Sequence, residues 1–300
     1  MLIDLRYHLI SLVAVFLALA VGILVGSSFI VGSSIERQVA QGLERQFGTI
    51  RAENRKQQQL IENLREQTKK QMEFGRAAAP MLVHGRLSWR RVAVIQTGDY
   101  SSAAQSAKSI LEEAGAKVTS VTTLSNLDSP SALERAGRAV ELITGVQDEH
   151  DPRGRMLSIV ADCIAGTASA DALGVCEGKG LLSTVGDYER RVLTIVLVGG
   201  AKQAASRRAE HTDLVLIDKL KEHGAITIIG CEPFDAVMSY IPAYHRKAIP
   251  TVDNIDQPSG QVGLVFAVGG ETGNLGAKKS ADHVAPAYLE SGQWRSEFPR

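Results

Sequence analysis

One short segment, TVDNIDQPSGQ, carries side chains whose types and spacing could bind a ligand. Asp253, Asn254, Asp256 and Gln261 offer carboxylate and amide oxygens, which hold hard cations or ligand hydroxyl groups in proteins. Asp and Asn are also the usual turn-forming residues that bond their own backbone, and a proline and a glycine stand among them. Both interpretations stay open at this point, and we predict that this segment is the working surface.

Three further loops follow apolar segments that read as strands. They contain Gly98-Asp99, Gly199-Gly200 and Gly230-Cys231-Glu232. In open parallel sheets ligands bind outside the carboxyl ends of the strands, so Asp99, Gly199 and Gly200 are further ligand-binding candidates. The glycine pair lacks both G-x-G-x-x-G and the G-K-S/T ending of a phosphate loop, and we therefore predict no nucleotide.

Catalytic motifs are missing from the sequence. It has no G-x-S-x-G, no H-E-x-x-H and no C-x-x-C, and none of its seven histidines stands three or four residues from another. Lys plus Arg equals Asp plus Glu, at 33 each, so no net field attracts nucleic acid. These features predict a protein that is neither an enzyme nor a nucleic-acid binder.

Three cysteines, Cys163, Cys176 and Cys231, are too few for a disulfide framework. A Cys163–Cys176 bridge remains possible if the domain lies outside the cell.

The elements that must position these residues begin with an uncharged apolar run from Leu9 to Val31. As a helix this run is about 34 Å long, enough to cross a hydrocarbon core of about 30 Å. A cleaved signal has a shorter apolar core, although Ala18-Leu19-Ala20 would suit a signal peptidase. We predict a retained single-pass anchor in the cell membrane, with residues 1–8 as a short cytoplasmic tail and the rest of the chain extracytoplasmic.

Small residues at four-residue steps form one stripe of this helix: Ala14, Ala18, Gly22 and Gly26. Such a stripe lets two membrane helices approach closely, although Gly and Ala are common in any membrane helix. Residues 35–76 then read as a coiled-coil stalk, because seam positions alternate in steps of four and three at Leu43, Phe47, Ile50, Asn54, Gln57, Ile61, Leu64, Thr68 and Gln71. A single solvated helix is the alternative. We predict a parallel homodimer, or a higher homo-oligomer, through both segments.

Near Ala77-Ala78-Ala79-Pro80 the stalk helix should end, since proline is poorly tolerated inside a helix. Residues 88–300 then alternate apolar strands with helices. We expect strands at 91–96, 117–122, 192–198 and 225–229, and helices at 102–114, over most of 131–182, at 209–223 and in GQVGLVFAVGG. This alternation predicts an α/β domain with a mainly parallel, Rossmann-like sheet covered on both faces.

The opening MLIDLRYHLISLVAVFLALAVGILVGS, together with IVLVGG, TVDNIDQPSGQVGLVFAV and GETGNLGAKKSADHVAP, resembles a bacterial family named for the mycobacterial copper transport protein MctB. The resemblance implies an envelope protein concerned with copper homeostasis or export. If the domain binds copper directly, Cys231 is the best single ligand, with Met238 and His245 as its nearest soft or borderline partners in sequence. A lone buried cysteine is more often simple packing, and no resident cofactor is expected.

The layout of anchor, stalk and ligand-poor domain also fits another function. A scaffold that positions cell-wall or cell-division machinery through an envelope protein partner has the same architecture. We keep this interpretation beside the copper interpretation.

Overall fold

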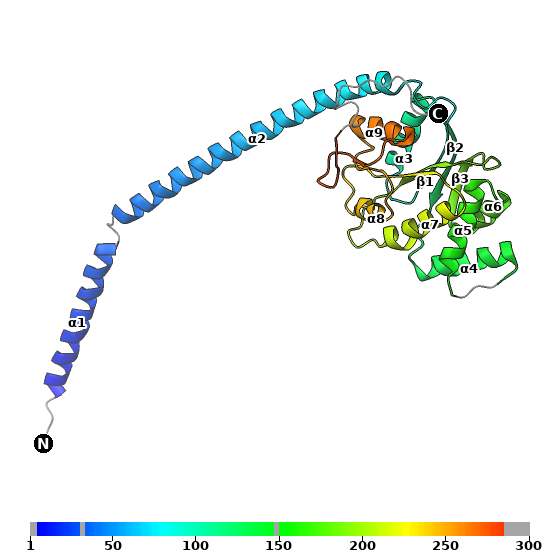
Figure 1. Cartoon of the computed structure of the whole chain (residues 1–300). Coiled ribbons are helices and arrows are strands. Elements are labelled where there is room, and N and C mark those ends of the chain that lie inside the picture. Colours follow the sequence, from blue (N-terminus) through cyan, green and yellow to red (C-terminus); the bar gives the residue numbers. More distant parts are fainter. Residues whose placement is uncertain (1–4, 31–33, 147–149, 285–300) are drawn as a thin grey trace. The chain divides into compact units, whose positions relative to one another are not determined.

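The structure is a computed structural model, and it describes residues 5–30, 34–146 and 150–284. The chain divides into two compact units, Met1–Lys69 and Lys70–Arg300. Each unit is described by itself below, with the helices and strands labelled as in Figure 1.

The first unit consists of helix α1, Leu5–Ile30, and most of helix α2, Ser34–Val83. Within α1, the stretch Tyr7–Ser27 is long and apolar enough to cross a membrane, by length and composition. The predicted span from Leu9 to Val31 therefore overlaps α1, although Val31 lies outside the described residues. Residues 34–69 of α2 are helical, in agreement with the predicted helical stalk.

The predicted end of the stalk helix near Pro80 is wrong, because α2 continues through Pro80 to Val83. A proline removes one backbone hydrogen bond, but packing can offset this loss. Ala79 and Val83 flank Pro80 and are buried in the core of the second unit. The next turn also closes normally, since the His84 amide donates to the Pro80 carbonyl oxygen at 2.9 Å.

A seven-stranded sheet forms the centre of the second unit, with strand order β3-β2-β1-β4-β5-β6-β7. All neighbouring strands are parallel except β3, which runs antiparallel to β2. The strands are β1 (Arg91–Gln96), β2 (Lys117–Leu124), β3 (Leu182–Gly186), β4 (Thr194–Val198), β5 (Thr227–Cys231), β6 (Thr251–Val252) and β7 (Asn274–Leu275). The predicted mixed α/β domain with a mostly parallel sheet is thus confirmed.

Helices cover both faces of this sheet (Figure 1). Successive side chains of a strand point to opposite faces, so Val92 and Val94 join one core and Ala93 and Ile95 join the other. The first core also receives the end of α2, α3 (Ser101–Glu113) and α9 (Pro258–Gly269). The second receives α4 (Pro130–Thr144), α5 (Pro152–Ala165), α6 (Asp171–Gly178), α7 (Leu214–Glu222) and α8 (Ile241–His245).

Several element boundaries differ from the sequence prediction. Helix α9 confirms the helical interpretation of GQVGLVFAVGG. The predicted helix 209–223 instead opens with a π-helical turn, Ala209–Asp213, before α7 begins. The predicted strand 225–229 is shifted by two residues, so Cys231 is the last residue of β5 and does not lie in the loop after it. Strands β3, β6 and β7 were not predicted.

Candidate functional site

The loops after β1 and β4 meet where the order of strands reverses, which is the place where open parallel sheets bind ligands. These two loops bond directly to each other. The Gly98 amide donates to the Val198 carbonyl oxygen at 3.0 Å, and the Asp99 amide donates to the Gly200 carbonyl oxygen at 2.9 Å. A Cβ atom on Gly98 would collide with the carbonyl oxygens of Gly199 and Gly200. The three predicted residues Asp99, Gly199 and Gly200 therefore lie together, and the backbone itself fills the space between their loops.

Asp99 forms an ion pair beside these two loops. One carboxylate oxygen accepts from Arg208 Nη2 at 2.8 Å, and the other accepts from the Lys202 amide at 3.0 Å. Burial opposes ionisation of the carboxyl group, but the Lys202 amide and the Arg208 guanidinium outweigh it and hold the pKa of Asp99 below its usual value. Arg208 also donates to the Thr97 carbonyl oxygen at 3.0 Å, so one guanidinium joins two points of the β1 loop.

A fully buried carboxyl group, Asp213, contacts the loop after β1 from the end of the π-helical turn. Its Oδ2 accepts from Thr97 Oγ1 at 2.7 Å and from Tyr244 Oη at 2.5 Å. Desolvation raises the pKa of Asp213 to about 7, although the hydrogen bonds from Tyr244 and Thr97 partly favour the charged form. A π-helical turn is rare and is often found at functional positions.

Gly199 is required by the tyrosines that surround this carboxyl group. Tyr240 and Tyr244 are both fully buried and meet edge to face, with ring centroids 6.4 Å apart. A Cβ atom on Gly199 would collide with Tyr244 Oη and would lie 2.6 Å from Tyr240 Cδ2. Gly199 thus allows the loop to approach two aromatic rings, which is a packing role and not the phosphate-loop pattern.

A second ion pair, with one buried member, lies at the ends of β5 and β7. Glu232 is fully buried, and its Oε1 accepts from Lys278 Nζ at 2.5 Å and from Ser239 Oγ at 2.6 Å. Its Oε2 accepts from the Tyr240 amide at 2.7 Å. Because a buried charge is costly unless it is paired and hydrogen-bonded, this arrangement fixes the loop after β5 against the loop after β7.

Asp253, the first predicted ligand residue, is buried and binds the backbone of the same C-terminal loop. Its two carboxylate oxygens accept from the amides of Ala277, at 2.8 Å, and Lys278, at 3.0 Å. Gly276 passes so close that a Cβ atom there would collide with the Asp253 carboxylate. In the structure, the Asp253 side chain thus binds backbone amides of a loop distant in sequence, and not those of its own turn.

The other three predicted residues of this segment are spread along the start of α9. Asn254 is fully buried and donates from Nδ2 to Ser259 Oγ at 2.9 Å. Asp256 accepts from the Phe234 amide at 2.7 Å, and Gln261 is partly exposed one turn into the helix. The segment also contains a strand of its own, β6, and a further strand, β7, follows it in the chain. Its role as the working surface stays a prediction.

The three predicted soft ligands do not share an open site. Cys231 is fully buried, and burial together with the neighbouring Glu232 charge raises the pKa of its thiol. Met238 pairs through its backbone with Ala201, and His245 Nε2 lies 3.2 Å from Thr251 Oγ1. Across residues 5–30, 34–146 and 150–284, no group of three or more His, Cys, Asp or Glu side chains is arranged to hold a metal ion.

Cys163 and Cys176 are free buried thiols here, and the disulfide left open by the sequence is not formed. Burial raises the pKa of each thiol to about 11.

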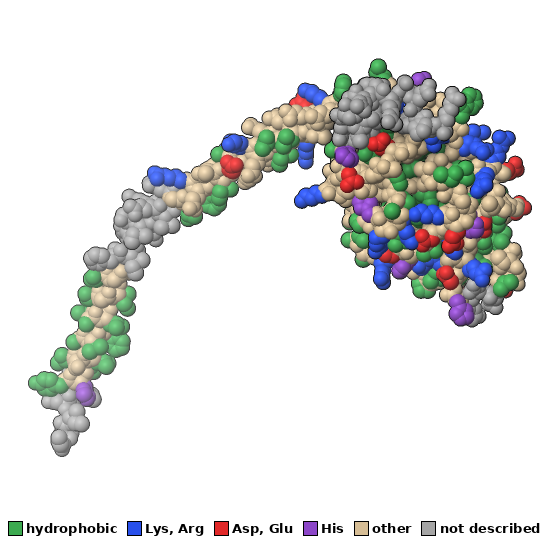
Figure 2. All heavy atoms as spheres, viewed as in Figure 1, with side chains coloured by type: hydrophobic (Ala, Val, Ile, Leu, Met, Phe, Trp, Pro, Cys, Tyr) green, Lys and Arg blue, Asp and Glu red, His purple; other side chains and the backbone are tan. Residues whose placement is uncertain are grey.

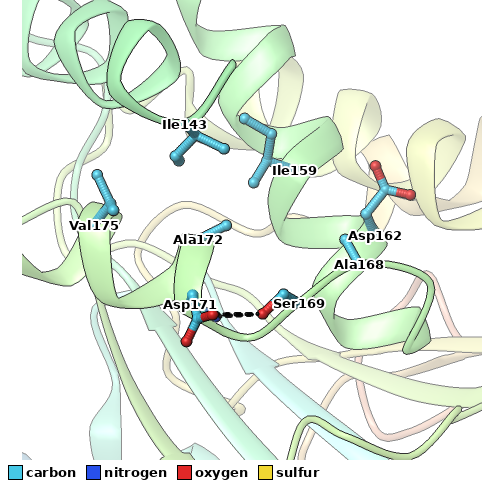
Figure 3. Close-up of a pocket in the computed structure, with 8 residues that line it drawn as sticks. All are labelled: Ile143, Ile159, Asp162, Ala168, Ser169, Asp171, Ala172 and Val175. Carbon is cyan, nitrogen blue, oxygen red and sulfur yellow. Dashed lines mark hydrogen bonds between the residues drawn. The ribbon is translucent and has the colours of Figure 1, made fainter. Parts of the chain in front are cut away.

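An apolar hollow of about 360 Å³ lies among α4, α5 and α6, and none of the predicted ligand-binding residues lines it (Figure 3). Its polar side chains are already engaged: Ser169 donates to Asp171 at 2.9 Å, and Asp162 accepts from His223 Nδ1 at 2.8 Å. It is lined by Ile143, Ile159, Asp162, Ala168, Ser169, Asp171, Ala172 and Val175. Its volume and its mostly aliphatic wall fall in the range of ligand pockets, but its Ser169, Asp171 and Asp162 side chains already bond within the chain.

The predicted dimerisation residues Ala14, Ala18, Gly22 and Gly26 all lie on α1 and are exposed. A Cβ atom on Gly22 or Gly26 would meet nothing within 4 Å. The stripe is therefore accessible in the single chain. On the visible face of the second unit, by contrast, basic and acidic side chains are interspersed (Figure 2).

The sequence analysis missed the charged residues that join the loops: Arg208, Asp213 and Glu232, which are buried, and Lys278, which is partly buried. These residues could not be recognised in the sequence because their neighbours are also polar: Arg208 and Asp213 lie in SRRAEHTD, and Lys278 lies in GAKKSAD. The one available signal was Glu232, a carboxyl group directly after an apolar strand, in a position comparable with Asp99.

The fold and the candidate membrane helix together define the class of protein: an α/β domain preceded in the chain by an apolar helix that is long enough to cross a membrane. The chain belongs to the family described as copper transport outer membrane protein, MctB, whose model matches residues 2–286. A search of curated proteins found no match. Membership implies copper transport or homeostasis and association with a membrane of the cell envelope.

Proposed function

We propose that the protein is a non-enzymatic envelope component of copper homeostasis, anchored by α1 and working as a scaffold. Family membership supports the copper process, and the apolar stretch of α1 supports the anchor. The observation that carries the scaffold role is α2, a single helix of 50 residues that follows the anchor in sequence and leads into the domain. At 1.5 Å per residue such a helix is about 75 Å long, which suits a spacer.

Copper is the cargo of the process, and in this proposal the domain does not hold it through a dedicated site. The contacts of the soft side chains support this. Cys231 lies inside the sheet core, and His245 contacts Thr251. Copper(I) sites use clustered thiolate or thioether ligands that the metal can reach. Direct binding through Cys231 remains the alternative, and a titration described below tests it.

The proposal places the short N-terminal tail in the cytoplasm and the Rossmann-like domain outside it. Arg6 in a short tail supports this orientation, since short basic tails tend to stay inside. The apolar seam positions of α2 and the small-residue stripe of α1 both support self-association, as a dimer or a higher homo-oligomer.

A second candidate function rests on the same helix. A self-associating stalk with a domain whose loops are sealed by ion pairs also suits a scaffold for cell-wall or cell-division machinery, bound to an envelope protein partner. The exposed seam of α2 favours this candidate as strongly as it favours a scaffold in copper homeostasis.

Growth and morphology of a deletion strain separate the two candidates. We expect the strain to grow more slowly than wild type in graded copper, with normal cell separation, and the full-length chain to restore growth. Normal growth in copper together with failed cell separation would replace the copper role by the second candidate.

A further inference from the structure

The apolar seam of α2 is unpaired in the single chain. Its apolar members, Leu43, Phe47, Ile50, Ile61 and Leu64, each keep between 48% and 56% of their surface exposed. Written as heptads, the seam places Phe47, Asn54, Ile61 and Thr68 at a positions and Leu43, Ile50, Gln57, Leu64 and Gln71 at d positions. A buried Asn at an a position is known to fix the alignment of coiled coils.

The same face of the helix changes its partner after Gln71. Continuing the alternating steps reaches Gly75, Ala78 and Leu82, and these positions face the domain of their own chain. A Cβ atom on Gly75 would lie 2.9 Å from Pro258 Cβ, and Leu82 packs against the core under α3 and α9. The pairing face therefore extends no further than Gln71.

A parallel, in-register pair matches every layer of the seam. Asn54 then meets Asn54 of the second copy, and the two amides can bond to each other. Gln57 meets Gln57 in the next layer, and each apolar side chain meets its own kind. Polar groups buried in an interface must be paired, so this match favours the alignment.

Antiparallel alignments match the seam less well. Full overlap sets Asn54 opposite Leu64 and Gln57 opposite Ile61, which leaves buried amides without partners. In a second antiparallel alignment, the overlap is shifted by one heptad toward the N-terminus of the seam. Asn54 then lies opposite Gln57, but Leu43 lies opposite Thr68.

Sliding the copies the other way needs Gly75 and Ala78, whose face the domain occupies. An antiparallel pair would also carry its two α1 helices at opposite ends of the stalk. Two anchors in one membrane favour a parallel pair instead.

We propose that a second copy of this chain covers the seam from Leu43 to Gln71, parallel and in register, with Asn54 and Gln57 as the matched polar layers that fix the alignment. The inference rests on the proposed self-association and specifies its geometry. It also assigns one helix face two roles: pairing up to Gln71, and packing on its own domain from Gly75 onward.

Oxidative cross-linking of single-cysteine additions to the full chain, in its native membrane, tests this geometry. Thr68→Cys and Gln71→Cys should form disulfide-linked dimers. Asn63→Cys, on the outer face of the helix, and Ala78→Cys, seven residues beyond Gln71 on the same face, should not. The three native thiols are fully buried, so a disulfide-linked dimer reports on the added cysteine. We expect at least a tenfold difference in initial rate.

Each outcome decides one part of the proposal. In the two antiparallel alignments open to the seam, the two Thr68 positions lie more than about 25 Å apart, so cross-linking no faster than at Asn63 would overturn the parallel register. Efficient cross-linking at Ala78 would overturn the change of partner at Gln71.

A last variant tests Asn54 itself. Asn54→Val in the Thr68→Cys background should lower the cross-linking rate severalfold, because other alignments become accessible. An unchanged rate would remove Asn54 from this role. Growth in copper is scored separately, so failure of the register and failure of the proposed function remain distinguishable.

Discussion

Replacing Asp213 by asparagine should make the second unit more stable at neutral and alkaline pH. The carboxyl group is fully buried, and its pKa rises from 3.8 to about 7 on folding. Between these two values the folded state holds a proton that the unfolded state has released. Stability contributed by the protonated carboxyl group therefore falls as pH rises from about 4 to about 7, and stays at its lower level above that.

The size of the effect follows from the same shift. One pKa unit corresponds to about 1.36 kcal/mol, so a rise of about three units costs the wild type on the order of 4 kcal/mol above pH 7. The asparagine side chain of the variant carries no charge and keeps an oxygen that can accept from Thr97 and Tyr244, the donors that now bind Asp213 Oδ2. The variant should lose the pH dependence and keep the hydrogen bonds.

Thermal unfolding of the full chain in detergent, followed by near-ultraviolet circular dichroism between pH 4 and pH 9, measures this difference. We expect the two melting temperatures to be similar at pH 4, and Asp213→Asn to melt on the order of 10 °C higher at pH 8. Asp256→Asn, which alters a partly exposed carboxylate, serves as the control and should follow the wild type. Parallel curves for wild type and Asp213→Asn would refute a buried carboxyl group with a raised pKa.

The remaining predictions concern the loops, the anchor and copper. Gly199→Ala should destabilise the second unit by about 2–4 kcal/mol, because the added methyl group overpacks two buried tyrosines, and an unchanged melting temperature would contradict this packing. Asp253→Asn should lower stability by about 1–3 kcal/mol through a weakened bond to a backbone amide; lost complementation at an unchanged melting temperature would instead reveal binding. Replacing Gly22 and Gly26 together by isoleucine should weaken self-association in a membrane two-hybrid assay, and an unchanged signal would leave the stripe as ordinary packing. Titration of copper(I) against a competing chelator should give the same affinity for wild type and Cys231→Ser, whereas a weaker variant would restore direct binding.

The architecture of the domain could be predicted from the sequence because its central strands are apolar almost throughout. Val92–Ile95 and Thr194–Val198 are buried on both faces, and such continuous apolar runs are typical of central parallel strands. Strand β3, with the burial of an edge strand, carries the mixed sequence LSTVG and gives no such signal. Strands β6 and β7 have two residues each, too short for any periodicity.

Asp99, Gly199 and Gly200 were predicted to lie at the carboxyl ends of parallel strands. That β1 and β4 are neighbours, and which residues these loops contact, could not be predicted. Arg208, the partner of Asp99, lies far along the chain directly before a π-helical turn, and a local pattern does not encode which distant group pairs with a carboxylate. The Pro80 prediction failed for a related reason: tertiary packing of α2 outweighed a local helix-breaking preference.

Complementation by two matched alleles under copper stress tests the central claim most directly, namely that the paired stalk, and not a copper ligand, carries the function. One allele replaces Ile61 and Leu64 by aspartate to break the seam, and the other replaces Cys163, Cys176 and Cys231 by alanine. With both proteins shown by immunoblot to reach wild-type abundance, we predict that the thiol-free allele restores growth in copper and the seam-broken allele does not. Growth restored by the seam-broken allele and lost with the thiol-free allele would contradict the account.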